Sequence, residues 1–102
     1  MDKFLKLENE FLKIKIDIQF GGKIVQILDK KNNIDWVWFN EKEYSNFKPD
    51  QFSDYDSQWI GGYEELFPND KIETLNSKQA PDHGELWSSS WEIINNTTTT
   101  LN

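Results

Sequence analysis

The sequence predicts an all-β domain, and three features of its first forty residues indicate this. Apolar residues alternate with charged ones in Phe11–Ile18, with the period of two expected of a strand that has one dry face. The Gly21-Gly22 pair then permits a tight reversal. A polar cluster at 30–33 separates the next two apolar runs. Short strands joined by such turns are typical of a meander of hairpins.

The runs expected to form strands are rich in isoleucine and aromatic residues, which suit a pleated surface. They lie at 3–7, 11–18, 23–29 and 34–39. The run at 23–29 is apolar on both faces, which is typical of a strand buried between layers. A polar and aromatic stretch without a clear period follows, and it contains a weak helical pattern at 41–47.

The second half of the chain is expected to be less regular. Glycines and prolines from 59 to 86 predict long loops with short extended pieces, and loops of that length are often functional. Regular structure is expected to resume at 86–94. A turn at Asn95-Asn96 then leads into 97–102, where four threonines predict a further strand; the alternative is a low-complexity tail. A strand with no partner beyond it leaves an open sheet edge, so we expect self-association through that edge.

Composition excludes several classes of function. The 102 residues suit one domain. The net charge is -7 and arginine is absent, so the chain would on average repel a nucleic-acid backbone. Without cysteine there is no disulfide framework and no thiolate nucleophile. No apolar run approaches the roughly 20 residues of a membrane helix, and the first residues lack the apolar core of a signal peptide. We therefore expect a cytoplasmic location with no nucleic-acid or membrane partner.

Two segments, 59–70 and 81–93, combine tryptophan with glycine, acidic residues and proline. This composition is typical of a sugar site, because an aromatic face packs on the C–H face of a pyranose while carboxylates and amides bind its hydroxyls. The alternative is that the tryptophans are core residues of a β-sandwich. Glu64 and Glu65 are adjacent and would point to opposite faces of a strand, so one could enter a cleft while the other faces water. The candidate sugar-binding residues of these segments are Trp59, Glu64, Glu65, Asp82, Glu85 and Trp87.

His83 is the only histidine, and histidine is the side chain best suited to proton transfer near neutral pH. Asp82 precedes it and Glu85 follows two residues later, so either carboxylate could orient the ring. The alternative is an ordinary histidine of a surface loop. A lone histidine, with no cysteine and no calcium-binding loop pattern, predicts no metal site.

Three segments taken in order are similar to a known family. They are GGKIVQILDKKNNIDWVW (21–38), WIGGYEELFPN (59–69) and PDHGELWSSSWEI (81–93). Together they resemble the N-terminal part of aldose 1-epimerase-like proteins, the galactose mutarotase family. The resemblance covers nearly the whole chain, but only the first part of a longer family member. It implies that residues 1–102 form a single domain, the N-terminal fragment of a large antiparallel β-sandwich known as a supersandwich.

The resemblance also implies a function. Family members bind a hexose in a cleft and interconvert its α and β anomers without a cofactor. By motif, His83 resembles the catalytic histidine that acts near the ring oxygen of the sugar, and Asn69 falls where the family places a substrate-binding polar residue.

Some features of the family pattern are missing from this sequence. The family places its base glutamate and second histidine in a C-terminal part that this sequence lacks, so we expect no mutarotation from the 102 residues alone. Asp70 and Lys71 stand where many members have an arginine. The alternative function is a non-catalytic carbohydrate-binding or protein-interaction β domain.

Overall fold

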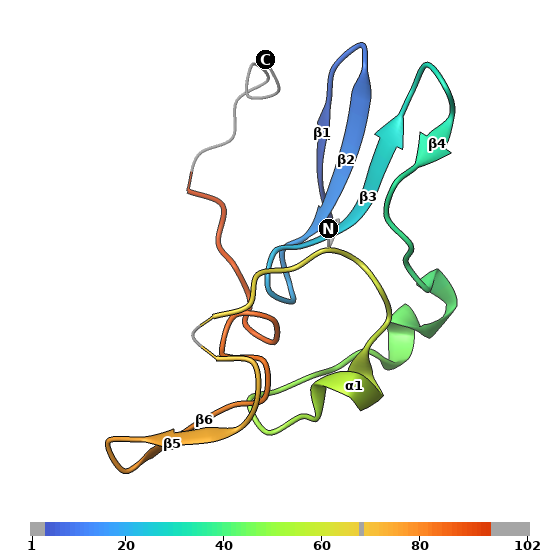
Figure 1. Cartoon of the computed structure of the whole chain (residues 1–102). Coiled ribbons are helices and arrows are strands. Elements are labelled where there is room, and N and C mark those ends of the chain that lie inside the picture. Colours follow the sequence, from blue (N-terminus) through green and yellow to red (C-terminus); the bar gives the residue numbers. More distant parts are fainter. Residues whose placement is uncertain (1–3, 68, 95–102) are drawn as a thin grey trace.

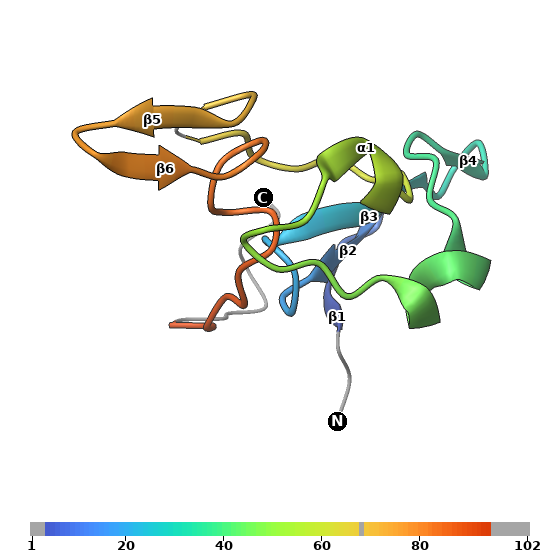
Figure 2. The same cartoon turned by 90° about the horizontal axis from the view of Figure 1, so that it is seen from below.

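A computed structural model describes residues 4–67 and 69–94, and their strands pair in antiparallel fashion (Figures 1 and 2). Within these ranges one sheet has the order β1-β2-β3-β4 and a separate hairpin pairs β5 with β6. The all-β expectation is confirmed. The strands are β1 (Phe4–Glu8), β2 (Leu12–Asp17), β3 (Lys23–Asp29), β4 (Ile34–Asp35), β5 (Glu73–Leu75) and β6 (Lys78–Ala80).

Two short helices connect the sheet to the hairpin. A 3-10 helix, η1 (Glu41–Asn46), occupies the weak helical pattern, and the single-turn helix α1 (Tyr55–Gln58) has no counterpart in the sequence-based expectations. Figure 1 shows the β5–β6 hairpin projecting from the end of the molecule opposite the tips of the large sheet. Neither of these helices is long or apolar enough to cross a membrane.

Two expected elements differ from the structure. β4 covers only two of the six residues expected at 34–39, and further along Phe39 forms an isolated bridge with Gly61. The expectation of regular structure at 86–94 is wrong, because this segment contains turns and no strand. It is held beside the 18–21 turn by backbone bonds, from Gly21 N to Ser89 O (2.6 Å) and from Trp91 N to Ile18 O (2.7 Å). The turn at 95–96 and the strand expected at 97–102 lie outside the described residues.

The two faces of the sheet are not buried as the alternation suggests. Asp17 and Lys23 pair across β2 and β3, and both side chains are fully buried. The isoleucine face, expected to be dry, is only half-buried at Ile16 and Ile18, which line an apolar cavity together with Trp91. Alternation sets which residues share a face, but the segment that packs on a face decides its burial.

A segment from residue 59 to 64 packs over Lys23 at the start of β3. Its Tyr63 exchanges both backbone hydrogen bonds with Ile24 at the start of β3, at 2.7 and 2.8 Å. Gly62 has a φ of +87°, and a Cβ there would lie 2.7 Å from Cγ and Cδ of Lys23. The glycine therefore permits both the turn and the close approach to the buried lysine.

A small aromatic core joins this segment to the C-terminal half. Its buried members are Phe47, Ile60 and Trp87. The half-buried side chains packed around them are Phe20, Phe39, Tyr44 and Tyr55. Because these residues come from five separate loops and two short helices, the core fixes the positions of segments that have little regular structure.

We expect Gly21→Ala to destabilise the fold by roughly 1–3 kcal/mol. Gly21 has a φ of +72°, and an added Cβ would lie 2.6 Å from Leu86 O and from Trp87 Cα, which are backbone atoms. Urea unfolding followed by circular dichroism measures the change. Glu10→Ala, at an exposed turn, is the control and should change stability by less than about 0.5 kcal/mol. Equal midpoints for the two variants would contradict this packing.

Asp17→Asn should stabilise the fold at neutral pH. Burial raises the pKa of Asp17 above its ordinary value, although its hydrogen bond from Gln19 N and the charge of Lys23 oppose the shift. A carboxyl whose pKa is raised on folding favours the native state when protonated and opposes it when ionised. The advantage of the amide should therefore vanish as the pH falls through the pKa of Asp17. Unfolding curves at neutral and acidic pH test this, and an advantage that grows towards acid would contradict it.

Candidate functional site

The turn that carries His83 follows β6 and is held by neighbouring backbone. His83 N donates to Asp70 O at 3.1 Å, and Glu85 N donates to Phe67 O at 2.9 Å. Phe67 also pairs with Gly84 in a parallel bridge. His83 itself has a φ of +60°, in the left-handed region that non-glycine residues rarely adopt. Two of the three segments that carry the family resemblance, 59–69 and 81–93, therefore lie side by side.

The imidazole of His83 lies between a carboxylate and an aromatic ring. Its Nδ1 is 2.8 Å from Asp82 Oδ1, and its ring stacks on Tyr55 with centroids 3.7 Å apart and planes 7° apart. An ionised carboxylate can only accept a hydrogen bond, so Nδ1 carries the proton. Nε2 is then the nitrogen left for a ligand, and the His83 side chain is 30% exposed.

Asp82 stays ionised because other groups favour its charge. The backbone N–H of Tyr55 donates to its Oδ2 at 2.8 Å. This bond, followed by the interaction with His83, lowers the pKa of Asp82 below its ordinary value. The carboxylate can therefore orient the imidazole of His83.

Behind Tyr55 lies a buried charge pair. Tyr55 donates its hydroxyl hydrogen bond to Glu64 Oε1, and Glu64 Oε2 is 3.3 Å from Lys23 Nζ. Burial and this hydrogen bond both raise the pKa of Tyr55 above its ordinary value, so the phenol remains neutral. Burial lowers the pKa of Lys23, while the charge of Glu64 opposes that shift.

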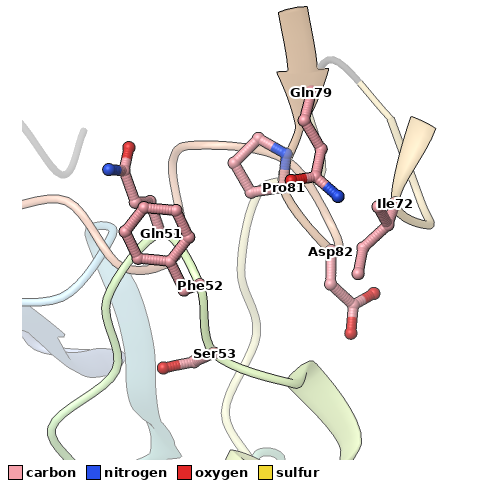
Figure 3. Close-up of a pocket in the computed structure, with 7 residues that line it drawn as sticks. All are labelled: Gln51, Phe52, Ser53, Ile72, Gln79, Pro81 and Asp82. Carbon is pink, nitrogen blue, oxygen red and sulfur yellow. The ribbon is translucent and has the colours of Figure 1, made fainter. Parts of the chain in front are cut away.

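A pocket of about 320 Å³ opens beside Asp82 (Figure 3). The 51–53 loop lies on one side of it, and β6 with the following Pro81 lies on the other. The volume is at the lower end of the range for small-molecule sites. Its lining mixes amide, hydroxyl, carboxylate and aromatic groups, which suits a polyhydroxylated ligand. The lining residues are Gln51, Phe52, Ser53, Ile72, Gln79, Pro81 and Asp82.

Three of the expected sugar-binding residues have their polar groups engaged within the protein. Both oxygens of Glu64 contact other side chains, as described above. Asn69 is buried, and its Nδ2 donates to Lys71 O at 2.5 Å and to Pro81 O at 2.7 Å. Trp87 is 2% exposed, and its Nε1 donates to Asp82 O at 2.7 Å. These residues support the His83 turn from within.

Apart from Asp82, which is described above, the remaining three expected residues reach the surface. Glu65 and Glu85 are exposed. Trp59 is 52% exposed and stacks on Trp38 at 5.3 Å between ring centroids. It lines a separate cavity of about 220 Å³ rather than the pocket beside Asp82. The structure thus brings His83, Asp82 and Trp87 together and leaves Trp59 elsewhere.

Sequence reasoning missed Tyr55, Lys23 and Phe52. Tyr55 and Phe52 lie in the stretch without a clear period, where no pattern separates one aromatic residue from another. Lys23 follows Gly21-Gly22 at the start of a strand, where a lysine is usually solvated. Among the described residues no group of histidines and carboxylates is arranged to hold a metal ion.

We expect the same substitution to have different effects at two tryptophans. Trp87→Ala removes a buried ring and should cost about 3–5 kcal/mol. Trp59→Ala removes a half-exposed ring and should cost less than about 1 kcal/mol. If Trp87→Ala does not fold, Trp87→Phe keeps most of the packing, loses the bond to Asp82 O and should cost about 1–2 kcal/mol. Urea unfolding by circular dichroism ranks the variants, and a larger loss at Trp59 would contradict the structure.

Comparisons with known proteins bear on the fold. No family model matches the sequence, and no curated protein matches it. Among solved structures, the chain is similar to a galactose mutarotase-like protein from Lactobacillus casei, with a TM-score of 0.62 and 20% sequence identity. The match covers 93% of this chain and 30% of that protein, so the chain spans under a third of its length. The chain therefore shares its fold with part of a mutarotase-like protein.

Proposed function

We propose that this chain is the carbohydrate-binding part of an aldose 1-epimerase-like protein, which in complete form interconverts the α and β anomers of a hexose. The observation that carries the proposal is the His83–Asp82 pair beside a pocket of mixed polar and aromatic lining. The fold likeness to a mutarotase-like protein supports it.

His83 acts as the general acid of this reaction. Its Nδ1–H is held by Asp82, so a protonated ring presents Nε2–H to the ring oxygen of the sugar. A base removes the proton of the C1 hydroxyl, and Nε2–H protonates the ring oxygen as its bond to C1 breaks. The open-chain aldehyde rotates about C1–C2. On closure the hydroxyl proton returns to Nε2 as that oxygen attacks the other face of C1, and the base returns its proton to the carbonyl oxygen, which becomes the new C1 hydroxyl.

In the proposed complex, three groups of the pocket recognise a neutral hexose. Phe52 is 80% exposed and offers an aromatic face for the sugar C–H groups. The amides of Gln51 and Gln79 can each donate to and accept from hydroxyls. The exposed Glu65 and Glu85 contribute at the periphery, whereas Glu64, Asn69 and Trp87 hold the turn from within.

A second candidate function is a non-catalytic carbohydrate-binding or protein-interaction domain. The observation that favours it is an exposed aromatic surface of Trp36, Trp38 and Trp59, which are 68%, 61% and 52% exposed. Aromatic residues are enriched at binding surfaces. In that function ligand would contact these tryptophans, and His83 would play no part.

Nuclear magnetic resonance can separate the two functions because the chain has one histidine. Addition of D-galactose or D-glucose should shift the ring signals of His83 saturably and leave the indole N–H of the buried Trp87 unchanged. myo-Inositol, a polyol of similar size without a ring oxygen or an anomeric carbon, is the control and should have little effect. Shifts confined to the indole signals of Trp36, Trp38 and Trp59 would favour the second function.

A further inference from the structure

We propose that Tyr55 is a positioning residue for His83, and that the buried Lys23–Glu64 pair holds Tyr55 in place for this purpose. The proposal rests on the function proposed for His83 and extends its site to Tyr55 and Lys23, which no sequence pattern assigned. It follows a continuous set of contacts that runs from the sheet to the imidazole.

The first step is the fixed position of Lys23. Its side chain is 1% exposed. Nζ donates to Gly61 O at 2.9 Å and lies 4.7 Å from the centre of the Phe47 ring. A buried ammonium group needs a counter-charge, and Glu64 supplies it at 3.3 Å. The carboxylate of Glu64 therefore has little freedom to move.

The second step is that the fixed carboxylate of Glu64 holds the hydroxyl of Tyr55. The Glu64 side chain is 9% exposed, and the oxygen that does not face Lys23 accepts the hydroxyl hydrogen bond of Tyr55. The Tyr55 ring also packs edge-on against Trp87, with centroids 5.2 Å apart and planes 78° apart. Both ends of the tyrosine side chain are thus fixed, although it belongs to a helix of a single turn.

The third step is that Tyr55 contacts both members of the proposed catalytic pair. Its backbone N–H donates to Asp82 Oδ2 at 2.8 Å, and its ring lies flat on the His83 ring. Asp82 fixes which nitrogen of His83 carries the proton, and the stack fixes the plane of the ring. Together they hold Nε2 in one direction, as an acid aimed at a single sugar oxygen requires.

The test reads the tautomer and ring environment of the single histidine by nitrogen-15 and proton resonance at a pH where the ring is neutral. In the unchanged chain we expect the Nδ1–H tautomer, with ring protons shifted upfield by the Tyr55 ring. Tyr55→Leu keeps the backbone N–H that binds Asp82 but removes the stacked ring. It should abolish the upfield shift and let the imidazole turn away from Asp82, towards the Nε2–H tautomer that a free histidine prefers. Tyr63→Leu makes the same change at the exposed neighbour of Glu64 and should alter neither signal.

Two conservative variants keep the test decisive if Tyr55→Leu does not fold. Tyr55→Phe keeps the ring and loses the bond to Glu64, and Glu64→Gln keeps the shape and loses the charge that faces Lys23. Both should retain part of the upfield shift, with signals broadened by a less fixed ring. Unchanged signals in all folded variants would overturn the proposal, because Tyr55 would then only fill space.

A sugar titration separates this inference from the proposed function. If both are right, Tyr55→Leu should weaken the affinity for sugar, read from the histidine shift during the titration, roughly tenfold. This is the change expected for loss of one oriented hydrogen bond. Equal affinity in the two chains would overturn the positioning role. If no sugar shifts the histidine of the unchanged chain, the proposed function fails, and the tautomer comparison alone decides whether Tyr55 orients His83.

Discussion

The structure depends on a buried ammonium group. Lys23 begins β3 with its side chain directed into the protein, where it contacts a carbonyl, a carboxylate and an aromatic face. Removing a charge from water costs several kcal/mol, and only a complete set of partners offsets that cost. All of these partners come from outside the sheet: Gly61, Glu64 and Phe47. One lysine therefore determines where two long loops must lie against the first hairpins.

The turn that carries His83 is held by a second set of contacts, which come from backbone groups, an indole and an amide. Trp87 fills the core and donates to the carbonyl of Asp82, while Asn69 bridges two carbonyls on either side of the β5–β6 hairpin. Tyr55 is the residue at which the two sets of contacts meet. A site with so little regular structure is ordered because hydrogen bonds from several segments converge on it.

The sequence pattern predicts the strands of the large sheet well because alternation and turn residues lie within each hairpin. The alternation in 11–18 and the Gly21-Gly22 reversal specify β2 and β3 within a residue or two. The same pattern cannot assign the buried face, because a strand-initial lysine such as Lys23 is expected to be solvated and only the packing of the 59–64 segment buries it. The 86–94 segment contains tryptophans and an isoleucine pair that suit a strand, yet it pairs only through single bonds.

The candidate site can be predicted only in part, because only some of its contacts join residues that are close in the sequence. His83 and Asp82 are adjacent, so their pairing is visible in the sequence, and the Gly61-Gly62 pair marks a close approach. Glu64 and Tyr55 lie nine residues apart, and no spacing rule connects a loop carboxylate to a tyrosine of a one-turn helix. Contacts of this kind arise from tertiary packing, which a single sequence does not encode in any short pattern.

The left-handed backbone of His83 has a consequence for engineering the chain. A side chain in that conformation costs about 1–2 kcal/mol relative to glycine, which adopts it freely. Directed evolution for thermal resistance alone would therefore favour glycine or asparagine at this position. Under the proposed function, selection for ligand capture would keep the imidazole. Stability and the proposed activity would then be opposed at one backbone torsion, and a stabilised scaffold would have to gain its stability elsewhere.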